Sequence, residues 1–291
     1  MIDKAKVRSV LVGLTPPIVY PMLRTVLNSA AFTSLSKRLG VNFYSSTWNT
    51  IKKGKFKGIS LFLDASKGSV WSKDVLSGAY DDYIFHYLKS SSLLGKTHFD
   101  IGAHVGITAL CFAQLVGSKG RVVAFEPNTF NLERLYVNIN RNTPLKKRIQ
   151  VEPLALSNKN GKEEFTFSSN IEDGTSSGSF LSSAHTILDK DSYVNDFGFR
   201  KVQVKTITLD SYVQRTGLKP DSLKIDVEGA EIFVLEGAKQ TLKKHHPMMF
   251  IELHSIYNAF RVAEMLVQMG YAMKLLHEER DGRCFIVAKH E

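Results

Sequence analysis

A glycine-containing turn joins a predicted buried strand to a predicted helix in the stretch HFDIGAHVGITAL, residues 98–110. Such turns hold the phosphates of dinucleotides, but they also hold other cofactors that carry adenosine. The dehydrogenase motif G-x-G-x-x-G needs a second glycine, because the backbone there approaches the pyrophosphate closely. Here Gly102 and Gly106 are present, but His104 fills the second glycine position and Ile107 the third. A bulky His at this point argues against NAD and FAD.

Carboxylates at two predicted strand ends favour another adenosine cofactor. The spacing D-x-G-x-x-x-G that begins at Asp100 resembles the first motif of class I methyltransferases, which bind S-adenosylmethionine. This cofactor carries an amino-acid tail and a sulfonium, so backbone amides and an acidic strand end can receive it without a close-packed anion site. Glu126 ends the next predicted strand, where a carboxylate with two acceptor oxygens can bind both ribose hydroxyls. The alternative, a turn that serves only packing, does not explain this acid.

Strands and helices alternate from residue 97 onward, and these elements must position the site. Short apolar runs and helical spacing predict βαβ units, with strands at 97–102, 121–127, 150–157, 222–229 and 248–254 and helices at 106–116, 128–142, from Ala230 and at 257–269. Two last strands, near 271–276 and 283–288, form a hairpin through the turn RDGR. Alternating runs at 162–169 and 201–213 indicate half-exposed strands. The sequence therefore predicts an α/β fold with a doubly wound, mostly parallel sheet of seven strands and a C-terminal antiparallel hairpin.

The chain divides into two predicted regions. Residues 1–95 form a basic N-terminal region with helices and a small hairpin at 56–71, and residues 96–291 form the cofactor-binding domain. Within that domain, the stretch 169–200 is rich in Ser and Gly and predicts a mobile insertion. This insertion either closes over an acceptor or is a plain disordered loop.

The cysteines and the N-terminal apolar stretch indicate the cellular location of the protein. Cys111 and Cys284 form no CxxC or Cys/His cluster, which argues against a zinc site or a disulfide framework and favours a reducing compartment. Pro16, Pro17 and Pro21 interrupt the N-terminal apolar stretch, so a signal peptide is disfavoured. The sequence predicts a cytoplasmic protein.

The positive charge is concentrated at the N-terminal end. Residues 1–95 carry 13 Lys and Arg against five Asp, although the whole chain has a net charge of only +10. The densest patch is KKGKFK, residues 52–57. Such asymmetry predicts an acidic partner for residues 1–57, either an anionic membrane surface, a phosphate-bearing substrate or nucleic acid. A solvated surface that only keeps the protein soluble is the alternative.

Several longer stretches resemble the FkbM-type methyltransferase family. They are FDIGAHVG, AFEPNTFNLERLYVNINRN, VEPLALSNKNG, LKIDVEGAEIFVLEGA and FIELH, which occur in the order typical of that family across residues 78–255. The resemblance implies a cytosolic class I fold that uses S-adenosylmethionine to methylate a hydroxyl oxygen. Typical acceptors of the family are sugars and other glycan or natural-product hydroxyls.

The resemblance also implies roles for individual residues. Asp100, Gly102 and Gly106 would line the methionine end, Glu126 and Asn128 would hold the ribose, Ala155 and Leu156 would lie near the adenine, and Asp226 would face the amino-acid tail or the methyl group. Two positions depart from the family. His104 replaces the usual Asn, and Asp81 stands where a Glu often follows Tyr before the first motif.

The predicted ends of the fourth and fifth parallel strands carry the groups that could act on an acceptor. Methyl transfer from a sulfonium is an in-line displacement, so the enzyme must align the acceptor and receive its proton. His254 is the candidate base because an unperturbed His has a pKa near 6.5, with Asp226 and Glu228 as further catalytic candidates. A structural role for His254 is the alternative, and Glu228 and Glu231 could instead bind sugar hydroxyls or favour a helix N-terminus. Asp226, Glu252 and His254 could also hold Mg²⁺ or Mn²⁺, although a metal is not favoured.

Nucleobase chemistry is disfavoured. The fourth strand end reads Asp-Val-Glu-Gly-Ala-Glu, without the prolines and aromatic ring that cradle a planar base, and neither Cys lies at a plausible strand end. We therefore expect an S-adenosylmethionine-dependent O-methyltransferase for a sugar, glycan, glycolipid or related hydroxyl. An RNA ribose methyltransferase and a non-catalytic cofactor-binding module are the alternatives.

Overall fold

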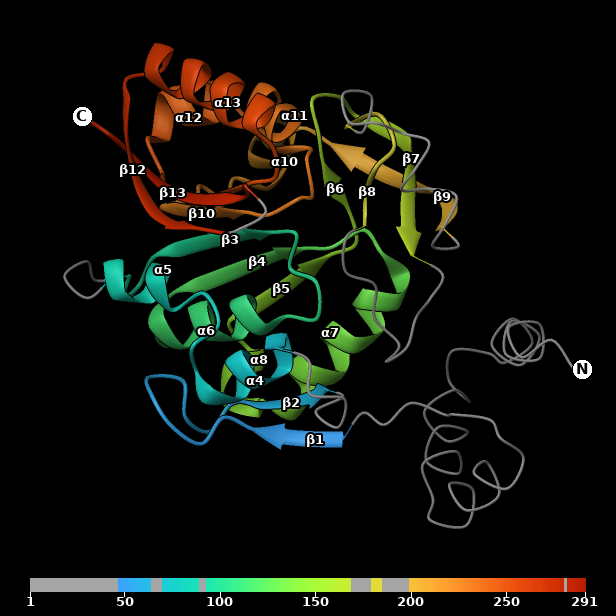
Figure 1. The fold of residues 1–291 in the computed structure, drawn as a ribbon, viewed down its shortest axis with the longest axis vertical. Coiled ribbons are helices and arrows are strands. Elements are labelled where there is room, and N and C mark those ends of the chain that lie inside the picture. Colours follow the sequence, from blue (N-terminus) through green and yellow to red (C-terminus); the bar gives the residue numbers. More distant parts are fainter. Residues whose placement is uncertain (1–46, 64–69, 89–92, 169–178, 185–198, 280–281) are drawn as a thin grey trace, which may run out of the picture. The chain divides into compact units, whose positions relative to one another are not determined.

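A seven-stranded sheet forms the centre of the computed structural model (Figure 1), which describes residues 47–63, 70–88, 93–168, 179–184, 199–279 and 282–291. Its strand order is β12-β13-β11-β10-β3-β4-β5. The strands are β3 (Thr97–Ile101), β4 (Arg121–Phe125), β5 (Ile149–Glu152), β10 (Ser222–Ile225), β11 (Met248–Leu253), β12 (Tyr271–Glu278) and β13 (Cys284–His290). All pairs are parallel except those of β13, which lies antiparallel between β11 and β12. The predicted α/β fold, a mostly parallel seven-stranded sheet with a C-terminal antiparallel hairpin, is confirmed.

Helices cover both faces of this sheet (Figure 1). One face packs against α4 (Val70–Ser77), α5 (Asp82–Tyr87), α6 (Ile107–Leu115), α7 (Thr129–Arg141) and α8 (Thr143–Lys146). The other packs against α10 (Leu209–Thr216), α11 (Glu231–Glu236), α12 (Lys239–His245) and α13 (Ile256–Gln268). Because successive side chains of a strand point to opposite faces, Val122 and Ala124 join the first core, whereas Val123 and Phe125 join the second.

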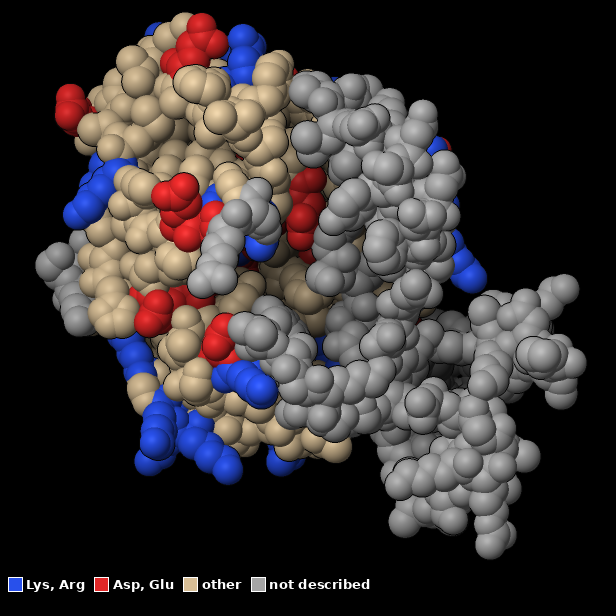
Figure 2. Space-filling view, in the orientation of Figure 1, with Lys and Arg blue, Asp and Glu red and all other residues tan. Residues whose placement is uncertain are grey.

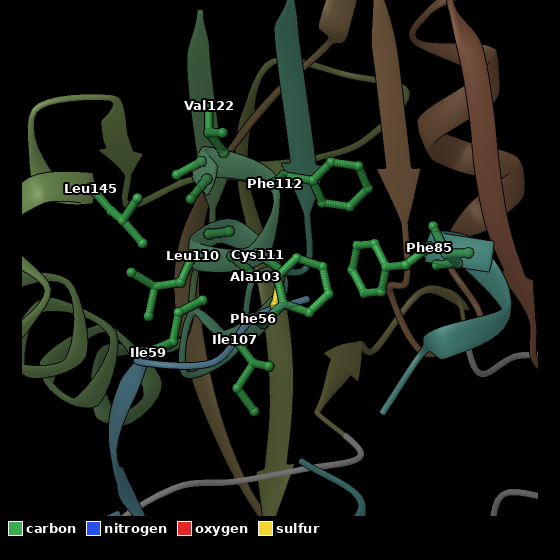
Figure 3. Packing of buried hydrophobic residues seen from close by; sticks show 14 of the residues in the cluster. Phe56, Ile59, Phe85, Ala103, Ile107, Leu110, Cys111, Phe112, Val122 and Leu145 are labelled. Carbon is green, nitrogen blue, oxygen red and sulfur yellow. The ribbon is translucent and has the colours of Figure 1, made fainter. Parts of the chain in front are cut away.

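Helix α6 is buried on every side. Its residues Ile107–Ala113 are all buried, so it lacks the polar stripe of a surface helix. Figure 3 shows its side chains packed against Phe56 and Phe85, whose ring centroids lie 4.4 Å apart. The segment before residue 95 thus contributes to the same core as the glycine turn at the start of α6.

A small hairpin before α4 is held by α7. Strand β1 (Thr47–Thr50) pairs antiparallel with β2 (Ser60–Leu63). Buried Asn138 of α7 accepts a hydrogen bond from the Phe62 N–H at 2.7 Å. The hairpin expected at 56–71 is therefore displaced, because its first strand pairs with an earlier segment and its end lies in α4. The helices expected within residues 1–46 lie outside the described residues.

A second sheet of order β6-β9-β7-β8 adjoins the core. It comprises β6 (Ala155–Leu156), β7 (Gly161–Ser168), β8 (Phe180–Leu181) and β9 (Phe199–Ile207). The predicted strand 150–157 is divided between the two sheets at Pro153, which has no N–H to donate to a ladder. The predicted strand 201–213 ends at Ile207, because Thr208 caps α10 by accepting from the Ser211 N–H at 3.1 Å. Most of the predicted insertion 169–200 lies outside the described residues.

No helix in the described part of the chain combines the length and the apolarity that crossing a bilayer requires.

Candidate active site

A cavity of about 910 Å³ opens at the carboxyl ends of the parallel strands, where ligands of such sheets bind. Its walls include the glycine turn after β3, the ends of β4, β10 and β11, strand β6, the start of α5 and the C-terminal hairpin. Figure 2 shows acidic side chains gathered around a hollow in this face. The cavity therefore combines the predicted cofactor turn with the predicted catalytic strand ends.

The glycine turn brings two strand ends into direct contact. Gly102 has φ +85°, and a Cβ built on it would lie 1.8 Å from the carbonyl oxygen of Asp226. Only glycine can therefore occupy this position without moving the backbone after β10. His104 also has a positive φ of 50°, and its N–H donates to Glu126 Oε2 at 2.8 Å. The turn is thus tied to both neighbouring strands.

Glu126 is held in a fixed orientation at the end of β4. In addition to the bond from His104, its Oε1 accepts the Asn128 N–H at 2.9 Å. Burial raises the pKa of Glu126 to about 7, although these backbone hydrogen bonds oppose the shift. The carboxylate lines the cavity and still offers acceptor lone pairs there.

The remaining predicted cofactor residues fall into two groups. Asp81, Gly102, His104, Glu126, Ala155, Leu156 and Asp226 line the cavity, whereas Asp100, Gly106 and Asn128 do not. Asp100 is fully buried and accepts the Thr108 hydroxyl at 2.7 Å. Gly106 starts α6 with φ 86°, and Asn128 caps α7. These three residues position the walls rather than form them.

Asp81 presents an unsatisfied acceptor. The carboxyl group is 7% exposed, and its Oδ1 accepts the Tyr83 hydroxyl at 2.8 Å. Its Oδ2 is buried and has no hydrogen-bond partner among the described residues. A buried acceptor without a partner costs free energy, so this position suits a ligand that donates a hydrogen bond or carries positive charge.

A buried ion pair fixes Asp226 after β10. Lys224, 3% exposed, donates to Asp226 Oδ2 at 2.7 Å. Burial raises the pKa of Asp226, but the Lys224 ammonium and His254 lower it to about 2. Asp226 is therefore ionised at neutral pH, with its other oxygen directed towards His254 at 3.8 Å from Nε2.

His254 lies among four carboxylates and does not line the cavity. Its Nδ1 is 2.9 Å from Oε1 of the fully buried Glu231, and its Nε2 lies 3.4 Å from oxygens of Glu228 and Glu252. Burial lowers the pKa of His254, but the hydrogen bond to Glu231 and the surrounding carboxylates raise it from 6.5 to about 10. The premise of an unperturbed pKa does not hold, because the imidazole is already protonated at neutral pH.

We expect the His254 imidazolium to persist to pH 9, as read from its ¹⁵N ring shifts by NMR. Because the folded pKa exceeds the unfolded value of 6.5, His254 stabilises the fold fully below pH 6.5, and this contribution is lost as pH rises through about 10. Glu231→Gln should lower the pKa and reduce the loss of unfolding free energy between pH 7 and 10. A neutral ring at pH 7 in the wild type would contradict the assignment.

Three residues could offer ligand atoms to a metal ion. Asp226, Glu252 and His254 each have one such atom within 4.8 Å of the others. Two cations already occupy this region, because Lys224 binds Asp226 and Arg283 Nη1 lies 3.0 Å from Glu252 Oε1. Burial and the nearby Asp226 charge raise the pKa of Glu252 to about 9, which reflects the crowding of acids.

Several wall residues were missed by sequence reasoning. Lys224 had a usable signal, since a Lys two residues before Asp226 in an apolar strand must point to the same side as that acid. Tyr83, His277 and Arg283 had none, because the fold brings α5 and the C-terminal hairpin to the cavity from opposite ends of the domain.

Comparisons with known proteins identify the family of the chain. Residues 100–279 match the Methyltransferase FkbM domain family. The chain is similar to the hexuronic acid methyltransferase AglP of Haloferax volcanii, with 26% identity over 79% of this chain and 84% of that protein. It is also similar to the 2-O-methyltransferase NoeI of Sinorhizobium fredii, with 31% identity over 50% of this chain and 58% of that protein.

A solved methyltransferase FkbM from Methylobacillus flagellatus shares 18% identity with the chain, covering 73% of this chain and 52% of that one, with a TM-score of 0.47. The family match spans more than half of the chain and contains the glycine turn and the acidic ends of β10 and β11. The chain belongs to the FkbM methyltransferase family and is an S-adenosylmethionine-dependent methyltransferase.

Proposed function

We propose that this enzyme methylates a hydroxyl oxygen of a sugar, glycan, glycolipid or related acceptor. The observation that carries the proposal is the single cavity that Gly102 and Glu126 line together with the acidic strand end at Asp226 and Glu228. The names of two relatives, a hexuronic acid methyltransferase and a 2-O-methyltransferase, support a sugar acceptor.

The residues present fit S-adenosylmethionine. Glu126 offers acceptor oxygens for the ribose, Ala155 and Leu156 offer an apolar wall for the adenine, and the unpartnered Asp81 Oδ2 suits the ammonium of the amino-acid tail. The glycine at position 102 lets the cofactor turn lie directly against the Asp226 carbonyl, which any side chain would prevent. When bound, this cofactor supplies an electrophilic methyl group on a sulfonium.

The acidic strand ends would align the acceptor and receive its proton. Glu228 is 37% exposed and lines the cavity, so it can accept the hydroxyl proton directly. Asp226 would orient the acceptor and stabilise developing positive charge. His254 would hold both carboxylates in place through its Nε2 rather than act as the free base.

A methyl-transfer assay over sugar-nucleotide and glycan acceptors tests the proposal. Transfer to a hydroxyl of one acceptor class, abolished in Glu228→Ala, is expected. Calorimetry with S-adenosylmethionine complements the assay. Binding of the cofactor without transfer to any acceptor would indicate a non-catalytic cofactor-binding module. An RNA ribose methyltransferase would instead transfer methyl groups to RNA and bind it with a steep salt dependence.

We expect methyl transfer to continue in EDTA. Lys224 and Arg283 already contact the carboxyl groups of Asp226 and Glu252 that a divalent ion would need. Initial rates with EDTA, with and without added Mg²⁺, provide the measurement. Loss of activity in EDTA with recovery in Mg²⁺ would instead assign a metal to Asp226, Glu252 and His254.

Contact of residues 1–57 with an anionic membrane surface in the cytoplasm remains a proposal. In the described part of this region, residues 47–57, the side chains of lysines 52, 53, 55 and 57 are exposed. Such a patch is attracted to anionic lipid, and co-sedimentation with vesicles that contain phosphatidylserine tests it.

A further inference from the structure

The part of the cavity beyond the cofactor turn is strongly acidic. Apart from Glu126 and Asp81, six carboxylates from five segments line it, namely those of Asp74, Asp82, Asp226, Glu228, Glu252 and Glu279. Among the described lining residues, the only Lys and Arg side chains are Lys224 and Arg283. The His254 imidazolium beside Glu228 and Glu252 adds a third cation behind this wall, and Glu252, with its pKa of about 9, is protonated at neutral pH. Five carboxylates therefore face three cations around an acceptor.

Both lining cations are engaged with carboxylates of the same wall. Lys224 Nζ is 2.7 Å from Asp226 Oδ2, and Arg283 Nη1 is 3.0 Å from Glu252 Oε1. An acceptor carboxylate or phosphate that bound either cation would have to displace one of these acids. It would then leave that acid uncompensated in a poorly solvated site.

Asp81 adds an observation of another kind. Its Oδ2 is buried in this wall without a hydrogen-bond partner among the described residues. This oxygen can accept a hydrogen bond or face a positive charge, but it would repel an anion. The ammonium of the bound cofactor would face this oxygen, so Asp81 offers no positive charge to an anionic acceptor in the same cavity.

Aromatic rings form the other feature of the acceptor side. Tyr83 stacks on His277 with centroids 5.0 Å apart and an interplanar angle of 9°, and it lies 4.7 Å from the Phe285 ring. All three residues line the cavity. Aromatic rings beside carboxylates suit a sugar, whose C–H face packs on a ring while its hydroxyls donate to the acids.

We propose that the acceptor of this enzyme is a neutral or amino-bearing sugar, and that the acidic wall rejects uronic acids and sugar phosphates. This inference rests on the proposed sugar O-methylation and narrows it. It separates the chain from its relative named for a hexuronic acid, and it argues against a phosphate-bearing acceptor despite the basic residues 52–57.

Matched acceptors test the charge preference. The p-nitrophenyl β-glycosides of glucose, galactose and mannose are compared with the corresponding 2-amino sugars and uronic acids, using the full chain and labelled S-adenosylmethionine. We expect kcat/KM for neutral or amino forms to exceed that for the uronic acids by about tenfold or more, since each nearby carboxylate repels an anion at short range.

Glu279→Gln, which removes one rim charge, should raise the uronic-to-neutral ratio of kcat/KM by about threefold. Glu278→Gln is the matched control, because Glu278 precedes it in the chain but does not line the cavity, and its ratio should stay unchanged. Preferred transfer to the uronic acids would overturn the inference and leave sugar O-methylation intact. Absence of transfer to every sugar would overturn the proposed function and this inference with it.

Discussion

Gly102→Ala is expected to abolish cofactor binding and to destabilise the fold by roughly 3 kcal/mol or more. The added Cβ would lie 1.8 Å from the Asp226 carbonyl oxygen, and φ at this position is +85°. The oxygen cannot simply withdraw, because the Asp226 N–H is itself bonded to the Ile101 carbonyl at 3.0 Å. Relief would require β3 and the segment after β10 to separate, which would displace Asp226 and the turn that receives the cofactor.

Gly217→Ala is the matched control for this substitution. Gly217 also has a positive φ, +71°, but a Cβ there would meet nothing within 4 Å. Gly217→Ala should lower the free energy of unfolding by only roughly 1–2 kcal/mol, the cost of a left-handed backbone for a residue with a Cβ. Its affinity for S-adenosylmethionine should stay normal. Chemical denaturation measures the stability of both variants, and calorimetric titration measures their affinity for S-adenosylmethionine. The difference between the variants reports the close approach to Asp226, because both share the cost of a positive φ. Equal losses of stability and affinity in the two variants would show that the close approach of Gly102 to Asp226 is not what requires glycine there.

The order of the main elements could be predicted from the sequence because each signal is local. The apolar strand before Gly102, the buried helix after it and the acid at the end of β4 lie within 30 residues. The division at Pro153 was missed because the apolar pattern continues through it, although proline interrupts a ladder. The start of α10 was missed because the alternation of KVQVKTI was extended into LDSYV, whereas the Thr208 cap starts a helix there.

The candidate site residues at the strand ends could be named from the sequence, but their ionisation could not. The pKa of His254 depends on Glu231 of α11 and on acids after β10 and in β11, which only the sheet brings together. The same packing buries Glu231 completely, so it cannot bind a sugar hydroxyl as one interpretation of the sequence allowed. The residues next to His254 and Glu231 in the sequence therefore do not reveal the charges that surround these side chains in the folded protein.

Asp226→Asn is expected to lower kcat for methyl transfer by roughly 10²–10⁴-fold while the protein stays folded. Asp226 is ionised at neutral pH and lies at the wall where the acceptor and the sulfonium would meet. Asparagine removes the charge but keeps a carbonyl oxygen that can accept from Lys224. Single-turnover rates at saturating S-adenosylmethionine would show the loss in the chemical step.

Asp226→Ala should differ from Asp226→Asn in stability, because it removes every acceptor that Asp226 offers to the buried Lys224 ammonium. Breaking a buried ion pair in this way costs about 3–5 kcal/mol, although Asp81 and Asp100 also act on the Lys224 charge and reduce the loss. Asp221→Asn is the control for charge removal, since Asp221 pairs with Lys96 at the opposite end of β10 and should leave kcat unchanged. If Asp226→Asn retained full kcat, the carboxylate would serve only to neutralise Lys224, and the proton of the acceptor would have to pass to Glu228 without its help.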